Sequence, residues 1–326
     1  MSAWDLKFVN PASSGAELAH AVQAGVQACA SMQALCNASD LIISAVTASN
    51  TLAVAQQAAV HVRAGSVFLD FNSASPGTKQ QCSALIEARS LGGRRNVGCK
   101  LTAAVYFSPI SCQISIYSAA KSSKTIPSRG PIFAQTPSAA QAPSGAHYVE
   151  AGVMTSVPPY GIKTPMSLGG PAAAALAPLF VSWGMDAKTV SDKLAVPSAI
   201  KMCRSVMIKG LEALVIESYT TARAYGVEDH VLPTLAETFP SIDWEKTGAY
   251  FFSRVAQHGQ RRAEEMREAA NTVKEAGFEP LMASAIADKQ QWVAAQAQAT
   301  VFDGVGKAAR WQDYADALLA AKKLSK

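Results

Sequence analysis

The sequence lacks the features of exported, membrane-spanning or disulfide-stabilised proteins. Six cysteines are scattered over 326 residues without a Cys-x-x-Cys pair, which predicts free thiols in a reducing compartment. No run of about 18 apolar residues occurs, so no transmembrane helix is expected. The segment Met1–Pro11 lacks the basic and long apolar regions of a signal peptide. We therefore expect a cytoplasmic protein that does not bind membranes.

Acidic residues are absent from position 89 to position 143, where seven of the 29 basic residues lie. The remaining 22 basic residues face 24 acidic ones, so the formal net charge of +5 belongs to this one segment. We therefore expect no nucleic-acid partner, and binding through the basic segment ranks last among the hypotheses. The histidines have no cysteine or carboxylate at ligand spacing, so no metal site is expected.

The first half of the chain alternates short apolar runs with helical patterns, which is typical of a parallel α/β sheet. Ser75 and Pro76 suit the capping and first positions of a helix. The expected strands are 3–9, 26–29, 40–46, 66–71, 146–153, 164–168 and 187–191, and the expected helices are 16–24, 51–62, 76–88 and 171–183.

From Ser198 onward, apolar residues recur at helical spacing. The expected helices are 198–225, 228–238, 243–276, 280–300 and 311–324. We predict two domains, an α/β domain at 1–193 and an all-helical domain at 194–326 for substrate binding and dimerisation. The segment 89–143 interrupts the first domain without a sustained period, so we expect a disordered insertion. Within it, Ala103–Ile116 is an apolar patch that would suit a strand pair.

A doubly wound α/β half followed by a helical half suggests a dinucleotide enzyme, whose fingerprint is Gly-x-Gly-x-x-Gly after the first strand. No such motif lies near the start. Gly304-Val305-Gly306 is interpreted as a loop between helices, because no strand precedes it.

Four segments resemble one known family. They are 40–49 (DLIISAVTAS), 66–78 (SVFLDFNSASPGT), 148–170 (YVEAGVMTSVPPYGIKTPMSLGG) and 198–209 (SAIKMCRSVMIK). They are similar to segments of the β-hydroxyacid dehydrogenase superfamily, which includes 3-hydroxyisobutyrate dehydrogenase. The amino-acid sequences of 198–214 and 258–270 look closest to the 6-phosphogluconate-dehydrogenase-like branch, whose helical C-terminal domain has no assigned function.

The resemblance implies a Rossmann-like α/β domain that holds NADP or NAD, followed by an all-α domain. Aligned this way, Met1 falls near the second strand of the family, so we expect the first strand and the glycine loop to be missing. The implied cofactor-binding residues are Asp5, Val46, Thr47, Asn72 and Ser73. For Asp5, the alternative is a solvated acid at a strand end. A missing start and the unmatched segment 89–143 favour a faulty gene model or a degenerate copy.

Lys201 matches the family's catalytic lysine. Hydride transfer from a hydroxyl-bearing carbon requires a base for the hydroxyl proton, and burial lowers a lysine pKa toward neutrality. Lys201, Ser205 and Lys209 share a helix face because they are four residues apart. Ser205 stands where most relatives have a substrate-holding asparagine, and Arg204 or Lys209 suits a substrate carboxylate or phosphate. The alternative is that these cations lie in solvent.

Two further segments align with substrate-contacting parts of the family. Met154, Thr155 and Ser156 replace a Ser-Gly-Gly loop, and they suit packing as well as substrate binding. His258, Arg261, Arg262 and Glu265 stand where relatives carry a Lys-Asp pair. For these residues we favour an exposed charged helix face with pairs inside the helix.

The leading hypothesis is an oxidoreductase that transfers a hydride between NAD or NADP and a small hydroxy acid or its keto partner. The resemblance also implies a homodimer formed by the helical half. The alternative hypothesis is a catalytically inactive remnant that folds and dimerises through its helical domain without binding a cofactor.

Overall fold

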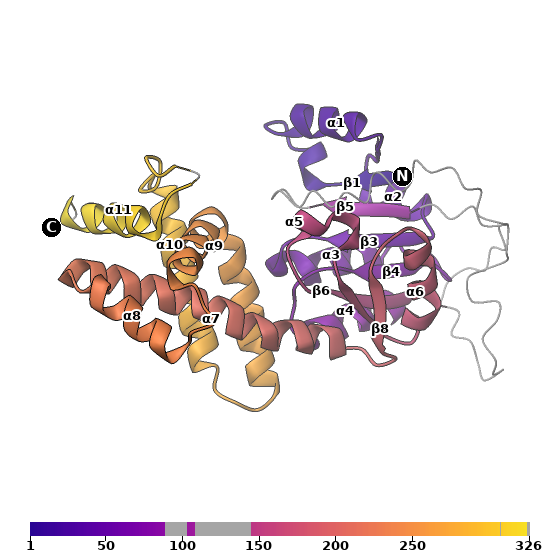
Figure 1. Ribbon diagram of the computed structural model, residues 1–326. Helices are drawn as coiled ribbons and strands as arrows, with labels where there is room; N and C mark the ends of the chain where they lie inside the picture. The colour runs from indigo at the N-terminus through magenta and orange to yellow at the C-terminus, as the bar shows by residue number, and fades with distance from the viewer. Residues whose placement is uncertain (89–102, 108–144, 307, 325–326) are drawn as a thin grey trace. The chain divides into compact units, whose positions relative to one another are not determined.

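The computed structural model describes residues 1–88, 103–107, 145–306 and 308–324. The chain divides into two compact units, Met1–Lys201 and Met202–Lys326 (Figure 1). The predicted class, a Rossmann-like α/β domain followed by an all-helical domain, is confirmed. The units divide inside one long helix, whereas the sequence pattern placed the domain boundary before its start.

The first unit holds all the described strands, and six helices longer than a single 3₁₀ turn lie within it. The strands are β1 (Ser2–Trp4), β2 (Gln27–Ala28), β3 (Leu41–Ala45), β4 (Val67–Asp70), β5 (Ala103–Phe107), β6 (His147–Val153), β7 (Met166–Gly169) and β8 (Ala187–Ser191). The helices are α1 (Ser14–Gln23), α2 (Met32–Asn37), α3 (Thr51–Ala59), α4 (Pro76–Ala88), α5 (Val157–Tyr160) and α6 (Ala173–Ser182). The predicted strand 3–9 ends early, because the Asp5 side chain accepts the Lys7 N–H and starts a 3₁₀ turn at Leu6–Phe8.

The strands form one sheet in the order β2-β1-β5-β3-β4-β6-β7-β8. The pairs from β2 to β6 are parallel, β7 runs antiparallel to β6, and β8 is parallel to β7. The chain moves from β1 to β2 in one direction and from β3 through β4 to β6 in the other. The direction therefore reverses around β5, which makes β5 the neighbour of the topological switch point.

The strand β5 corrects two expectations from the sequence. Ala103–Phe107 lies inside the segment 89–143 that we expected to be disordered, and it pairs with β1 on one side and β3 on the other. The place beside β3 where we expected a strand to be missing is therefore filled by a strand from later in the chain. The physical reason is backbone pairing, because a gap between β1 and β3 would leave two buried strand edges without partners. The rest of 89–143 lies outside the described residues.

Alternating side chains of the sheet pack against helices on opposite faces. Ile42, Phe68 and Tyr148 lie in one core with residues of α2, α3 and α4. Their chain neighbours, such as Ile43 and Leu69, lie in a second core with residues of α6. The sheet is thus covered on both faces, as its continuous apolar strands require.

The second unit is helical, and the helix that leads into it starts in the first unit. The helices are α7 (Val196–Tyr225), α8 (Glu228–Thr238), α9 (Trp244–Glu275), α10 (Leu281–Gln298) and α11 (Trp311–Leu324). Gly226 follows α7 with φ +67°, and Asp243 caps α9 by accepting the Lys246 N–H at 3.0 Å. Among the described residues, no helix is both long enough and apolar enough to cross a bilayer.

The central position of β5 gives a testable expectation. Val105→Pro removes a backbone donor from a strand that pairs on both sides. We expect the free energy of unfolding to fall by about 1–3 kcal/mol or more, measured by urea denaturation. Val105→Thr keeps the N–H and the branched side chain, and it serves as the control. Equal stability of the proline variant and the control would contradict the role of β5.

Candidate functional site

The predicted cofactor residues gather at one edge of the sheet. Because β1, β5, β3, β4 and β6 are mutually parallel, their carboxyl ends lie at the same edge. Asp5 follows β1, Val46 and Thr47 follow β3, and Asn72 and Ser73 follow β4. This is the edge at which open α/β sheets bind their ligands.

Asp5 is the acid at the end of β1. Its side chain is buried, and its Oδ1 accepts the Lys7 N–H at 2.9 Å. Burial raises the pKa of the carboxyl, while the Lys7 N–H and the Lys7 ammonium oppose the shift. The alternative of a solvated strand-end acid is wrong, whereas the ribose-binding role stays a prediction.

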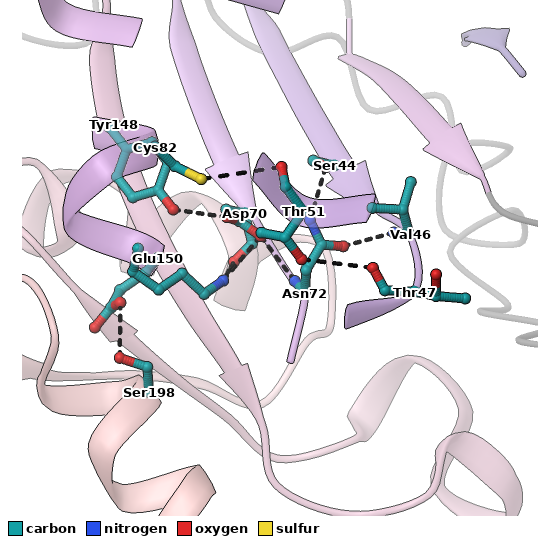
Figure 2. Close-up of polar contacts among 11 residues, drawn as sticks. Ser44, Val46, Thr47, Thr51, Asp70, Asn72, Cys82, Tyr148, Glu150 and Ser198 are labelled. Carbon is teal, nitrogen blue, oxygen red and sulfur yellow. Dashed lines mark hydrogen bonds and ion pairs between the residues drawn. The ribbon is translucent and has the colours of Figure 1, made fainter. Parts of the chain in front are cut away.

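Asn72 clamps two of the loops at this edge (Figure 2). Its Oδ1 accepts the Val46 N–H at 2.5 Å, and its Nδ2 donates to Ser44 Oγ at 2.9 Å. Beyond the clamp, Thr47 Oγ1 accepts from Asn50 Nδ2 at 3.0 Å and lies 3.1 Å from Ser49 Oγ. The structure therefore joins Val46 and Asn72 directly, with the Asn72 amide holding the backbone after β3. Ser73 is half-buried beside it.

Beneath the edge lies a buried charged cluster that the sequence analysis did not predict. Lys79 Nζ of α4 lies 2.8 Å from Asp70 Oδ1, and their side chains are 2% and 1% exposed. Tyr148 of β6 donates its hydroxyl to Asp70 Oδ2 at 2.6 Å, and the Asn72 N–H donates to Asp70 Oδ1 at 2.8 Å (Figure 2). Burial, followed by the charge of Asp70, raises the pKa of Tyr148 well above its usual value. The tyrosine therefore stays a hydrogen donor to the carboxylate.

The predicted substrate loop follows β6 at the same edge. Met154, Thr155 and Ser156 are half-buried, and the Met154 N–H donates to Pro165 O at 3.0 Å. The loop then enters the short helix α5, in which Val157 is buried. Substrate contact by these three residues stays a prediction.

The predicted residues of α7 fall into two environments. Lys201 is half-buried and is the last residue of the first unit. In the second unit, Arg204 is exposed, whereas Ser205 and Lys209 are buried. Lys209 Nζ lies 3.0 Å from Glu265 Oε1 of α9 and 3.2 Å from Ser205 Oγ. Lys209 therefore does not lie in solvent, and its ammonium holds two helices together.

The prediction of an exposed charged face on α9 is wrong for two of its residues. Arg262 and Glu265 are buried. Arg262 Nε donates to Glu212 Oε2 of α7 at 2.9 Å, and Gln290 of α10 donates to the same oxygen at 3.3 Å. These side chains pair with other helices rather than within α9, because the α9 face that carries them packs on α7.

His258, on the same helix, is half-buried. Burial and then the nearby charges of Arg254, Arg261 and Arg262 lower its pKa to about 4. The imidazole is therefore neutral at physiological pH, which excludes it from the cationic substrate contacts that a Lys-Asp pair would supply.

Three comparisons place this arrangement among known proteins. The family described as "Domain of unknown function (DUF1932)" matches residues 222–293, and no curated protein matches. The crystal structure of a conserved hypothetical protein from Sinorhizobium meliloti 1021 is 30% identical, with a TM-score of 0.62, over 98% of this chain and 87% of that chain.

Two further solved structures share the fold. One is the conserved protein MTH1747 of unknown function, whose structure is described as similar to 3-hydroxyacid dehydrogenases (23% identity, TM-score 0.54, 90% of this chain and 89% of that chain). The other is 3-hydroxyisobutyrate dehydrogenase from Salmonella typhimurium (15% identity, TM-score 0.52, 97% of this chain and 90% of that chain).

The chain belongs to the same family as the Sinorhizobium meliloti protein, and it has the fold of the 3-hydroxyacid dehydrogenases. The sheet order, the helical second unit and the four sequence segments on which the resemblance rests agree with this fold.

The carboxyl edge of the sheet fits a nicotinamide dinucleotide in part. Asp5, the loop at Val46 and Thr47, and Ser73 supply polar groups at the carboxyl edge, where its ribose and nicotinamide would be held. The phosphate end fits less well, because the sequence has no Gly-x-Gly-x-x-Gly and no glycine between Phe107 and Gly130.

Because Lys79 and Asp70 form a buried ion pair, we expect a large loss of stability when one of them is replaced. Lys79→Met leaves the Asp70 carboxylate buried without its counter-charge, which should lower the free energy of unfolding by about 3–5 kcal/mol. Urea denaturation followed by circular dichroism measures the change. Lys188→Met is the control, because that side chain is 78% exposed and should contribute little. Equal effects of the two substitutions would show that the buried pair is not needed.

Proposed function

We propose that this protein is an NAD(P)-dependent oxidoreductase that transfers a hydride between nicotinamide and a small hydroxy acid or its keto partner. The observation that carries the proposal is the gathering of Asp5, the Asn72-clamped loop and the loop at Met154 at the carboxyl edge of one parallel sheet. The fold, which the chain shares with a 3-hydroxyisobutyrate dehydrogenase, supports it. The substrate class rests on the resemblance at Lys201.

Lys201 has the chemistry that the reaction requires. As the hydroxyl-bearing carbon is oxidised, the hydroxyl must lose a proton, and in reverse the forming alkoxide must gain one. The Lys201 amine, which is half-buried, is the group that we propose exchanges that proton. The nicotinamide, when bound, accepts or supplies the hydride. Arg204 is exposed five residues before Lys209, and its guanidinium is open to a substrate carboxylate.

Lys201→Ala tests the function. We expect turnover to fall by about 10²- to 10⁴-fold, because the proton exchange is lost, while cofactor affinity stays unchanged. The assay follows reduced nicotinamide by absorbance with a panel of small 2- and 3-hydroxy acids, and nicotinamide fluorescence reports binding. We expect the wild type to bind NADH and NADPH more weakly than micromolar, because the glycine turn is absent from the sequence.

Lys188→Ala, which removes an exposed ammonium, is the control and should keep full turnover. Unchanged turnover in Lys201→Ala would remove Lys201 from its role. Absence of turnover in the wild type with every acid tested would instead favour the alternative, a protein of this fold that dimerises without catalysis.

We also propose a homodimer formed through the helical unit. Met207, Leu211 and Leu214 of α7 recur at helical spacing and are 66%, 36% and 57% exposed. Where α9 is followed by α10, Phe278 and Leu281 are also exposed. Large apolar side chains gathered on a surface are typical of protein–protein contact.

Leu214→Glu should weaken this dimer by about tenfold in dissociation constant, because a charge replaces an apolar contact. Sedimentation velocity over a range of concentrations measures the change. Ala236→Glu on the exposed face of α8 is the matched control. A monomer at all concentrations of the wild type would contradict the proposal.

A further inference from the structure

The first turn of α7 is held against the sheet by close backbone packing. A Cβ on Gly169 of β7 would lie 2.6 Å from the ring of Pro197, and a Cβ on Gly152 of β6 would lie 3.2 Å from Pro197 O. Only glycine at these two positions allows the helix start to approach so closely. Pro197 therefore sits directly on two neighbouring strands.

The chain enters this turn through a constrained residue. Ala195 has φ +76°, a left-handed conformation that side-chain-bearing residues rarely adopt. Its carbonyl accepts the Ala199 N–H at 3.0 Å and the Ser198 hydroxyl at 3.0 Å. Such a conformation persists only where the surrounding structure enforces it, so the direction of α7 is set at this point.

Glu150 of β6 forms the polar part of the same contact (Figure 2). Its side chain is fully buried, and its Oε2 lies 3.3 Å from Ser198 Oγ. Among the described residues, Oε1 has no hydrogen-bond partner. The Ser198 hydroxyl has one hydrogen, and Ala195 O at 3.0 Å is the nearer acceptor. When the hydroxyl donates to that carbonyl, a protonated Glu150 supplies the hydrogen of the second bond.

Burial and the groups that face Glu150 act on its pKa in opposite directions. Burial is the largest effect and raises the pKa of Glu150. Lys79 of α4 and the hydrogen bonds from Ser198 oppose the shift, and Asp70 of β4 adds to it. Lys79 is paired with Asp70 at 2.8 Å, so its charge acts on both buried carboxyl groups. Tyr148 of β6, also close, stays a neutral phenol.

We propose that Glu150 is a positioning residue for Lys201. Through Ser198 it fixes the first turn of α7 on β6, while Pro197 seated on Gly152 and Gly169 prevents that turn from sliding. Lys201 follows Ser198 by three residues and lies on the next turn of the same helix. This role of Glu150 rests on the proposed function, because it acts through the amine that is proposed to exchange the proton.

Competitive acetylation of the intact full-length protein, read by mass spectrometry, tests the proposal without requiring turnover. We expect the labelling rate of Lys201 to change by about threefold or more in Ser198→Ala and Glu150→Ala. Glu150→Gln keeps the shape and the hydrogen-bonding capacity of the neutral acid, so it should label like the wild type. Lys188, an exposed lysine of β8, is the internal reference in every variant.

Where turnover is measurable, Ser198→Ala should lower kcat and move the pH profile of kcat, with KM and cofactor affinity unchanged. Glu150→Gln should keep the wild-type profile. If Glu150→Ala does not fold, the labelling of Ser198→Ala decides between the outcomes. That substitution removes a single hydroxyl, so the protein should still fold. Unchanged Lys201 labelling in folded Ser198→Ala overturns the positioning role. Absence of turnover in the wild type overturns the proposed function instead. The labelling rate of Lys201 then still reports whether Ser198 and Glu150 fix its position.

Discussion

The first unit depends on one buried carboxylate. A charge taken out of water is tolerated only where donors and a counter-charge surround it. Asp70 receives the ammonium of Lys79, the hydroxyl of Tyr148 and the Asn72 N–H, which come from α4, β6 and the loop after β4. Asn72 then extends the same network to β3 through Ser44 and Val46. One acid at the end of β4 thereby fixes the positions of a helix, a neighbouring strand and two loops at the carboxyl edge.

The helical unit uses the same principle with different residues. Lys209 with Glu265, and Arg262 with Glu212, place two buried ion pairs between α7 and α9. Removing one partner of such a pair costs far more than the pair contributes, so these contacts select one register of the two helices over others. Lys209, for which substrate binding stays a prediction, thus also joins two helices.

Much of the fold follows from local patterns in the sequence. Alternating apolar runs identified β3, β4 and β6, and the Ser75-Pro76 pair marked the start of α4, where Ser75 Oγ accepts the Thr78 N–H at 3.2 Å. Gly226 marked the end of α7. These signals depend on neighbours within a few residues, which a single sequence contains.

The parts that could not be predicted depend on partners far away in the chain. The strand β5 lies in the apolar patch Ala103–Ile116 that the sequence pattern singled out, but its place in the sheet depends on pairing with β1 and β3, far away in the chain. Arg262 and Glu265 have the composition of an exposed helix face, and their partners lie 50 and 60 residues earlier. The role of Glu150 is hidden for the same reason, because Ser198 is 48 residues away.

The place of β5 in the sheet determines the order in which the strands can pair during synthesis. Ser2 lies beside Ala104 in the sheet, so β1 gains this inner neighbour only after about a hundred further residues have left the ribosome. Until then, among the described strands, β1 can pair with the two-residue β2, and a two-stranded ribbon of that length is not stable alone. While the chain grows, β3 and β4 with their helices can assemble first, and the amino-terminal strands join them only when the later segment emerges.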